Sequence, residues 1–107
     1  MLKNFRTYQL SIKFYGLCEQ TQIPAFLRNQ LLRAASSISL NLAEGSAKPI
    51  GKDRLRFYRI ALGSLRECQA VLDLNPRLNN LKVMADHLGG SLYRLCYQVS
   101  GTYPIIL

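Results

Sequence analysis

Few side chains in this 107-residue chain are suited to acid–base catalysis. His87 is its one histidine, and the neighbouring Asp86 points about 100° away from it on a helix, so the two do not form a dyad. Glu44 and Glu67 could act as paired carboxylates, but a helix-end charge and a surface ion pair explain them more simply. We therefore predict that the protein is not an enzyme.

The cysteines are equally poor candidates for a metal or redox site. Cys18, Cys68 and Cys96 are odd in number and far apart, and no C-x-x-C pair occurs. This pattern favours buried free thiols over a zinc site or a disulfide framework. The chain also has no glycine-rich phosphate loop, so we predict no cofactor.

Basic residues carry the stronger signal. The formal net charge is +8, which favours an acidic partner, most simply nucleic acid. At 100° per residue, one helix face would carry Lys52, Arg56, Arg59 and Arg66, with Gly63 and Ala70 leaving it flat. Lys48 lies just before this row. We predict that Lys48, Lys52, Arg56, Arg59 and Arg66 bind phosphates of RNA or DNA. An ordinary solvated helix face is the alternative.

A polar line accompanies the apolar stripe of the preceding segment. It consists of Gln30, Ser37, Asn41 and Glu44 at helical spacing. Small amides and hydroxyls suit hydrogen bonds across a helix or subunit contact better than a solvated face. We predict structural or oligomer contacts at Gln30, Ser37, Asn41 and Gly63.

Helical periodicity of apolar residues runs through the chain. It predicts helices over residues 4–19, 24–44, 52–74 and 76–99. Pro24 suits a first helical turn, Gly45 a left-handed helix end, and Asn75–Pro76 an N-cap followed by a first helical residue. Gly89–Gly90 indicates either a close helix–helix approach or a slight bend. The apolar tail, 102–107, would pack on its own domain or on a neighbouring subunit.

No strand pattern competes with the helices. We predict an all-α protein, with residues 1–107 forming a single domain that folds as an antiparallel up-down-up-down four-helix bundle. No stretch has the roughly 18 apolar residues of a membrane span, and the N-terminus does not read as a signal peptide. We therefore expect a cytoplasmic protein that does not enter a membrane.

Two segments resemble a known family of bacterial four-helix-bundle proteins. Residues 30–45, QLLRAASSISLNLAEG, resemble its second-helix signature Q-x-x-R-A-A-x-S-I-x-x-N-I-A-E-G. Residues 57–67, FYRIALGSLRE, resemble its third-helix pattern F-L-x-I-A-x-G-S-L-x-E. The family includes proteins encoded in intervening sequences of large-subunit ribosomal RNA genes. It also includes the accessory variability determinant of diversity-generating retroelements.

The resemblance implies a four-helix protomer that assembles into a ring, typically a homopentamer. In the retroelement members, the ring binds nucleic acid and a partner reverse transcriptase. The basic residues in these two segments or directly beside them are Arg33, Arg56, Arg59 and Arg66, of which Arg33 would be structural. The chain departs from the pattern at residues 46–48, where many members have an arginine, and at Arg54, which replaces an apolar residue. These departures leave the subfamily and the ring size open.

We therefore expect a non-catalytic, oligomeric, nucleic-acid-binding accessory protein, with a retroelement reverse transcriptase as its plausible partner. The alternative is a structural or protein-interaction bundle, an intervening-sequence protein without a nucleic-acid role.

Overall fold

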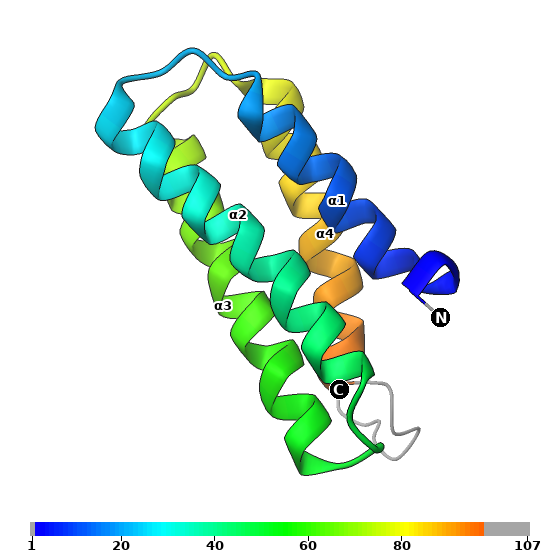
Figure 1. Ribbon diagram of the computed structural model, residues 1–107. Coiled ribbons are helices and arrows are strands. Elements are labelled where there is room, and N and C mark those ends of the chain that lie inside the picture. The colour runs from blue at the N-terminus through cyan, green and yellow to red at the C-terminus, as the bar shows by residue number, and fades with distance from the viewer. Residues whose placement is uncertain (1, 98–107) are drawn as a thin grey trace.

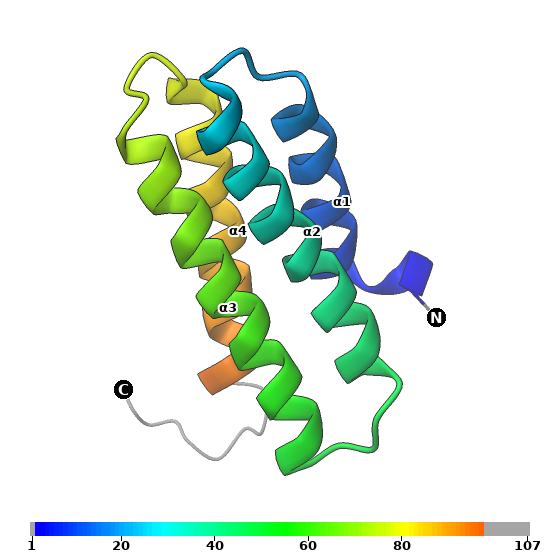
Figure 2. The same ribbon diagram turned by 60° about the vertical axis from the view of Figure 1, so that its left-hand side comes forward.

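Four α-helices form the structure, a computed structural model that describes residues 2–97 (Figure 1). They are α1 (Arg6–Glu19), α2 (Ala25–Ser46), α3 (Lys52–Asp73) and α4 (Asn79–Tyr97), preceded by a 3-10 turn, η1 (Leu2–Asn4). Consecutive helices run antiparallel, and α1 packs against α4 to close the bundle (Figure 2). The predicted all-α, up-down-up-down four-helix bundle is confirmed.

The core consists of the apolar residues whose spacing predicted the helices. Each helix contributes side chains with no solvent exposure, including Phe14 on α1, Leu31 and Ile38 on α2, Leu65 on α3, and Leu88 on α4. Each such side chain stabilises the fold by about 1.5–3 kcal/mol relative to an exposed one. The most extensive pairing is between the two longest helices, α2 and α3.

A polar pair bridges each of the four helix interfaces. Three pairs join hydroxyl groups at 2.6–2.8 Å, and the fourth is a bond from a glutamine amide to a carboxylate at 3.0 Å. In order from α1–α2 to α4–α1 they are Ser11–Ser39, Ser37–Ser64, Gln69–Asp86 and Thr7–Ser91. Two hydroxyl groups can form such a bond only when their residues lie at the same height along the bundle. These contacts therefore favour a single register of the apolar stripes.

Gly45 lies inside α2 and does not close it in a left-handed conformation, so this prediction is wrong. Its φ is not positive, and the helix continues to Ser46. A Cβ at Gly45 would lie 2.8 Å from Cε1 of Tyr58. The glycine therefore permits the close approach of α3, and it does not provide a turn.

Asn75 caps the end of α3, and it is not the N-cap that we predicted for the fourth helix. Its side-chain amide donates to the carbonyl of Val71 at 2.8 Å. A turn closed by Leu78 N donating to Asn75 O at 3.0 Å follows, and α4 begins at Asn79. Asn75 and Pro76 thus terminate one helix before the next begins.

Of the two roles predicted for Gly89–Gly90, the structure shows the close helix–helix approach, between α3 and α4 at Gly89. The helix α4 continues through both glycines, and a Cβ at Gly89 would lie 3.2 Å from Cδ1 of Leu65. The predicted apolar tail, 102–107, lies outside the described residues. Within residues 2–97, no helix is long and apolar enough to cross a membrane.

Candidate nucleic-acid interface

Helix α3 holds four of the five predicted phosphate-binding residues on its solvent side. Lys52, Arg56, Arg59 and Arg66 are all exposed, whereas the opposite side of α3 contributes Ala61, Leu65 and Cys68 to the core. At 1.5 Å per residue, the row from Lys52 to Arg66 spans roughly 21 Å, which matches about six nucleotides of one strand. We call these four residues the α3 row.

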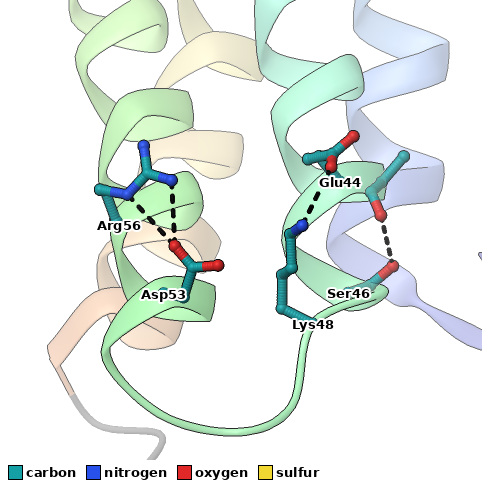
Figure 3. A network of polar contacts seen from close by, with 6 residues as sticks. Glu44, Ser46, Lys48, Asp53 and Arg56 are labelled. Carbon is teal, nitrogen blue, oxygen red and sulfur yellow. Dashed lines mark hydrogen bonds and ion pairs between the residues drawn. The ribbon is translucent and has the colours of Figure 1, made fainter.

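Two of the predicted cations have acidic partners near the α2–α3 loop (Figure 3). Lys48 lies 3.5 Å from Glu44, and Arg56 lies 3.0 Å from Asp53. Both pairs are solvent-accessible, so each stabilises the fold by about 0–1 kcal/mol. A phosphate could therefore replace either carboxylate at small cost, but both cations begin partly neutralised.

The ring of Phe57 lies between these two cations. The Arg56 guanidinium is 4.5 Å from the ring centroid, and the Lys48 ammonium is 5.6 Å from it. A cation over an aromatic face is weakly attracted to it, so the half-buried ring holds both side chains beside the loop.

The other members of the α3 row have no carboxylate partner among residues 2–97. Arg66 contacts only the side-chain oxygen of Gln69, at 3.4 Å, and Lys52 makes no polar side-chain contact. The guanidinium of Arg59 lies 5.3 Å from the ring centroid of Tyr97. None of the three is therefore paired with a carboxylate within residues 2–97, and Arg59 and Arg66 lie on the side of α3 nearest α4.

The sequence analysis missed an aromatic pair beside Arg59. Tyr93 and Tyr97 have ring centroids 4.8 Å apart, and both side chains are nearly half exposed. Their spacing of four residues on one helix could have revealed the pair, because residues at i and i+4 are neighbours.

Arg54 belongs to the same basic segment but turns inward. It is half-buried and donates through Nε and Nη2 to the carbonyl oxygen of Lys48, and through Nη2 to that of Ser46. These bonds satisfy the carbonyl of Ser46, the last residue of α2, and that of Lys48 in the loop that follows. The arginine at an otherwise apolar position therefore ties the loop to α3.

The polar line on α2 faces α3. Ser37 pairs with Ser64 at 2.8 Å, and Gln30 donates to Glu67 at 3.5 Å. Asn41 donates to the carbonyl and hydroxyl of Ser37 within α2. Gly63 is exposed, and a Cβ there would meet no atom within 4 Å. Nothing within residues 2–97 thus occupies the space over Gly63.

An exposed apolar pair lies one turn from the Ser37–Ser64 contact, and sequence reasoning did not single it out. Leu40 is 68% exposed and Ile60 is 42% exposed. Leu40 lies three residues after Ser37 on α2, and Ile60 lies four residues before Ser64 on α3. Since the two helices run antiparallel, Leu40 and Ile60 lie at about the same height along the bundle. Both residues break their helices' apolar stripes, which is the signal that could have revealed them.

The residues considered for catalysis do not come together. His87 is exposed on α4, and Glu44 at the end of α2 pairs with Lys48. Glu67 lies on α3 and accepts a hydrogen bond from Gln30 of α2. No three His, Cys, Asp or Glu side chains in the described part of the chain gather in a way that could hold a metal ion.

The three cysteines are buried free thiols, as predicted. Burial raises the pKa of Cys18 to about 12 and that of Cys96 to about 11. It raises the pKa of Cys68 as well. These thiols therefore stay protonated at neutral pH and are poor nucleophiles.

Comparison with known proteins identifies the family. Residues 4–101 match the model of the 23S rRNA-intervening sequence protein. No curated protein matches the chain. The match covers all four helices and includes both segments whose residues resemble the family's second and third helices. The chain belongs to the 23S rRNA-intervening sequence protein family.

Proposed function

We propose that this protein is a non-catalytic, oligomeric, nucleic-acid-binding accessory protein. The α3 row is the observation that carries the proposal, because Lys52, Arg59 and Arg66 project from one helix side and have no carboxylate partner within the described residues. Such a row neutralises successive phosphates and releases counterions. Binding would be directed mainly to the backbone of RNA or DNA, because most contacts of this kind carry no sequence information.

Self-association would use the neighbouring face, where α2 and α3 meet. Leu40 and Ile60 are exposed there, beside the polar line and next to Gly63, which leaves room for a close helix approach. Ile60 and Ser64 lie on the α2 side of α3, whereas Arg59 and Arg66 lie on the α4 side. A subunit contact on the first side, with Gly63 at its edge, leaves Arg59 and Arg66 accessible, so several copies would present several sets of these cations at once.

The exposed Leu40 and Ile60 also favour the alternative function, a protein-interaction bundle without a nucleic-acid role. Filter binding of labelled RNA and DNA at low salt separates the two functions. A nucleic-acid-binding protein retains the labelled strand, and its affinity falls linearly with the logarithm of the salt concentration. A protein-interaction bundle without a nucleic-acid role would not retain the labelled strand.

The decisive variant is the triple replacement of Arg56, Arg59 and Arg66 by glutamate. We expect loss of binding and, where residual binding is measurable, a salt slope shallower by about 2–3. The matched control replaces three exposed cations of η1 and α1, Lys3, Arg6 and Lys13, by glutamate, which changes the net charge equally. If both variants lose binding equally, or if the α3 variant binds like the wild type, the proposed interface is wrong.

A further inference from the structure

A small pocket opens at the end of the bundle where the N-terminal turn meets the α2–α3 loop. Its volume is about 300 Å³, and it is lined by Asn4, Phe5, Ser46, Arg54 and Tyr58. None of these residues is acidic. The pocket is at the lower end of the size range of small-molecule sites, so it would admit a small ligand.

Tyr58 contributes a buried side chain with an unused hydroxyl. The residue is 5% exposed, and its ring packs against Gly45 and lies 5.9 Å from the ring of Phe5. The hydroxyl makes no hydrogen bond within residues 2–97. Because no fully buried side-chain oxygen in this range lacks a partner, the hydroxyl oxygen must be partly accessible to solvent. The hydroxyl therefore reaches solvent, and Tyr58 is one of the residues that line the pocket. Burial raises the pKa of Tyr58, so the group remains a hydrogen-bond donor.

Arg54 supplies the positive charge. Its Nε and Nη2 atoms are bound to the carbonyls of Ser46 and Lys48, which fixes the guanidinium plane. Its Nη1 atom makes no hydrogen bond within the described residues, and the residue lines the pocket. Arg54 and Tyr58 lie one turn apart on α3, so both present their donors from the same helix face.

Asn4 adds a third donor from a different element. It is exposed in η1, and its side-chain amide makes no hydrogen bond to any residue in the described range 2–97. Phe5 provides an apolar wall next to it. The pocket thus combines one fixed guanidinium, a hydroxyl and an amide with an aromatic surface.

We propose that this pocket binds the phosphate group of a small phosphate ester. A phosphate monoester presents three acceptor oxygens, which three converging donors can satisfy, and arginine favours phosphate over a neutral acceptor. The organic part of the ester would lie against Phe5. This site differs from the α3 row, because Arg54 is not part of that row, and the inference goes beyond the nucleic-acid function proposed above.

The probe is ribose 5-phosphate, titrated into the full-length protein at constant ionic strength and followed by two-dimensional NMR. We expect saturable shifts of the backbone amides of Phe5, Ser46 and Arg54. Ribose without phosphate should produce no shifts. Equal shifts with both sugars, or shifts spread evenly over exposed basic residues such as Lys13 and Arg33, would overturn the proposal.

Tyr58→Phe is the decisive variant, since it removes the hydroxyl and keeps the ring that packs against Gly45. We expect affinity for ribose 5-phosphate to fall about tenfold, the effect of removing one hydrogen bond to a charged group. Tyr93→Phe is the matched control, because it removes an exposed hydroxyl elsewhere, and its affinity should be unchanged. Asn4→Ala, in an exposed turn, should weaken binding several-fold and does not depend on core packing. Wild-type affinity in both Tyr58→Phe and Asn4→Ala would refute the site.

Two sources could supply such a phosphate, a free ester or the terminal phosphate of a nucleic-acid strand. A 5′-phosphorylated oligonucleotide and its 5′-hydroxyl counterpart separate them. A preference for the phosphorylated strand that Tyr58→Phe abolishes identifies a strand end. No preference, with ribose 5-phosphate still bound, identifies a free ester. The glutamate variant of Arg56, Arg59 and Arg66 should retain ribose 5-phosphate binding, so failure of the nucleic-acid proposal would not mask this result.

Discussion

Replacing Gly63 with alanine tests the proposed subunit contact on the outer face of α3. Gly63 is exposed inside a regular helix and has no positive φ. A Cβ at this position meets no atom of the described part of the chain within 4 Å. The methyl group therefore adds nothing unfavourable to the isolated protomer, and any cost must arise from a partner.

The two expected effects have opposite signs. In the dissociated protomer, alanine should raise the free energy of unfolding by about 1 kcal/mol through helix propensity. For a domain of this length, that corresponds to an increase of about 4–8 °C in Tm. In a close subunit contact, the added methyl should cost about 1–3 kcal/mol by overpacking. The dissociation constant would then rise roughly 5- to 150-fold.

Sedimentation velocity over a concentration series measures the dissociation constant, and urea denaturation of the dissociated protein measures the free energy of unfolding. Gly16→Ala is the matched control, because Gly16 also lies inside a helix with no atom within 4 Å of a Cβ. It should stabilise the protomer similarly and leave assembly unchanged. A Gly63→Ala protein with the wild-type dissociation constant would refute the contact at Gly63. A wild type that is monomeric throughout would refute the oligomer.

Gly45, the buried thiols and Tyr93 can each be tested by one measurement. Gly45→Ala should lower the free energy of unfolding by about 1–2 kcal/mol in urea, because the Cβ would overlap the Tyr58 ring; an increase in stability would show that the helices can separate. Stability should be full below about pH 9 and fall as pH rises toward 11, because burial raises the pKa of Cys18 and Cys96 from 9.0 to about 12 and 11. Each thiol should contribute a slope of about 1.4 kcal/mol per pH unit in urea titrations, and Cys18→Ala should remove one such slope. Tyr93→Leu should change duplex affinity less than about twofold in filter binding if contacts are to the backbone, and a large loss would indicate base stacking.

The helices and their arrangement could be predicted from the sequence because burial repeats with the period of the helix. Leu31, Ile38 and Leu42, and then Leu88 and Leu92, mark faces that can be satisfied only by other helices. Short connections between such helices leave an antiparallel bundle as the simple solution. The exposed side of α3 could be predicted in the same way, because its basic residues also recur with the period of the helix.

The roles of individual polar residues could not be predicted, because each has several partners of similar energy. Asn75 could cap the end of one helix or the start of the next, and the two geometries differ by only a turn. Arg54 is adjacent in sequence to solvent-facing cations, yet the carbonyls of Ser46 and Lys48 draw it inward. Such choices depend on where the loop lies in space, which residue types and spacing do not specify.

The structure divides the basic segment into cations with different electrostatic weight, and this division can be measured. Lys52, Arg59 and Arg66 face solvent and pair with no carboxylate in the part of the chain that the structure describes. Arg56, in contrast, must give up Asp53 before it can fully neutralise a phosphate. Replacing Arg59 with glutamine should therefore reduce the salt slope of single-strand binding by about 0.7. Arg56→Gln should reduce the slope by less, because Asp53 already neutralises part of the Arg56 charge in the free protein.

Removing the carboxylate of Asp53 provides the control for the comparison of Arg56→Gln with Arg59→Gln. In an Asp53→Asn background, Arg56 has no acidic partner, so its replacement by glutamine should reduce the slope as much as the replacement of Arg59 does. Equal slopes for Arg56→Gln and Arg59→Gln in the wild-type background would mean that Asp53 does not screen Arg56. In that case exposure alone, and not ion pairing within the protomer, determines which cations act on the nucleic acid.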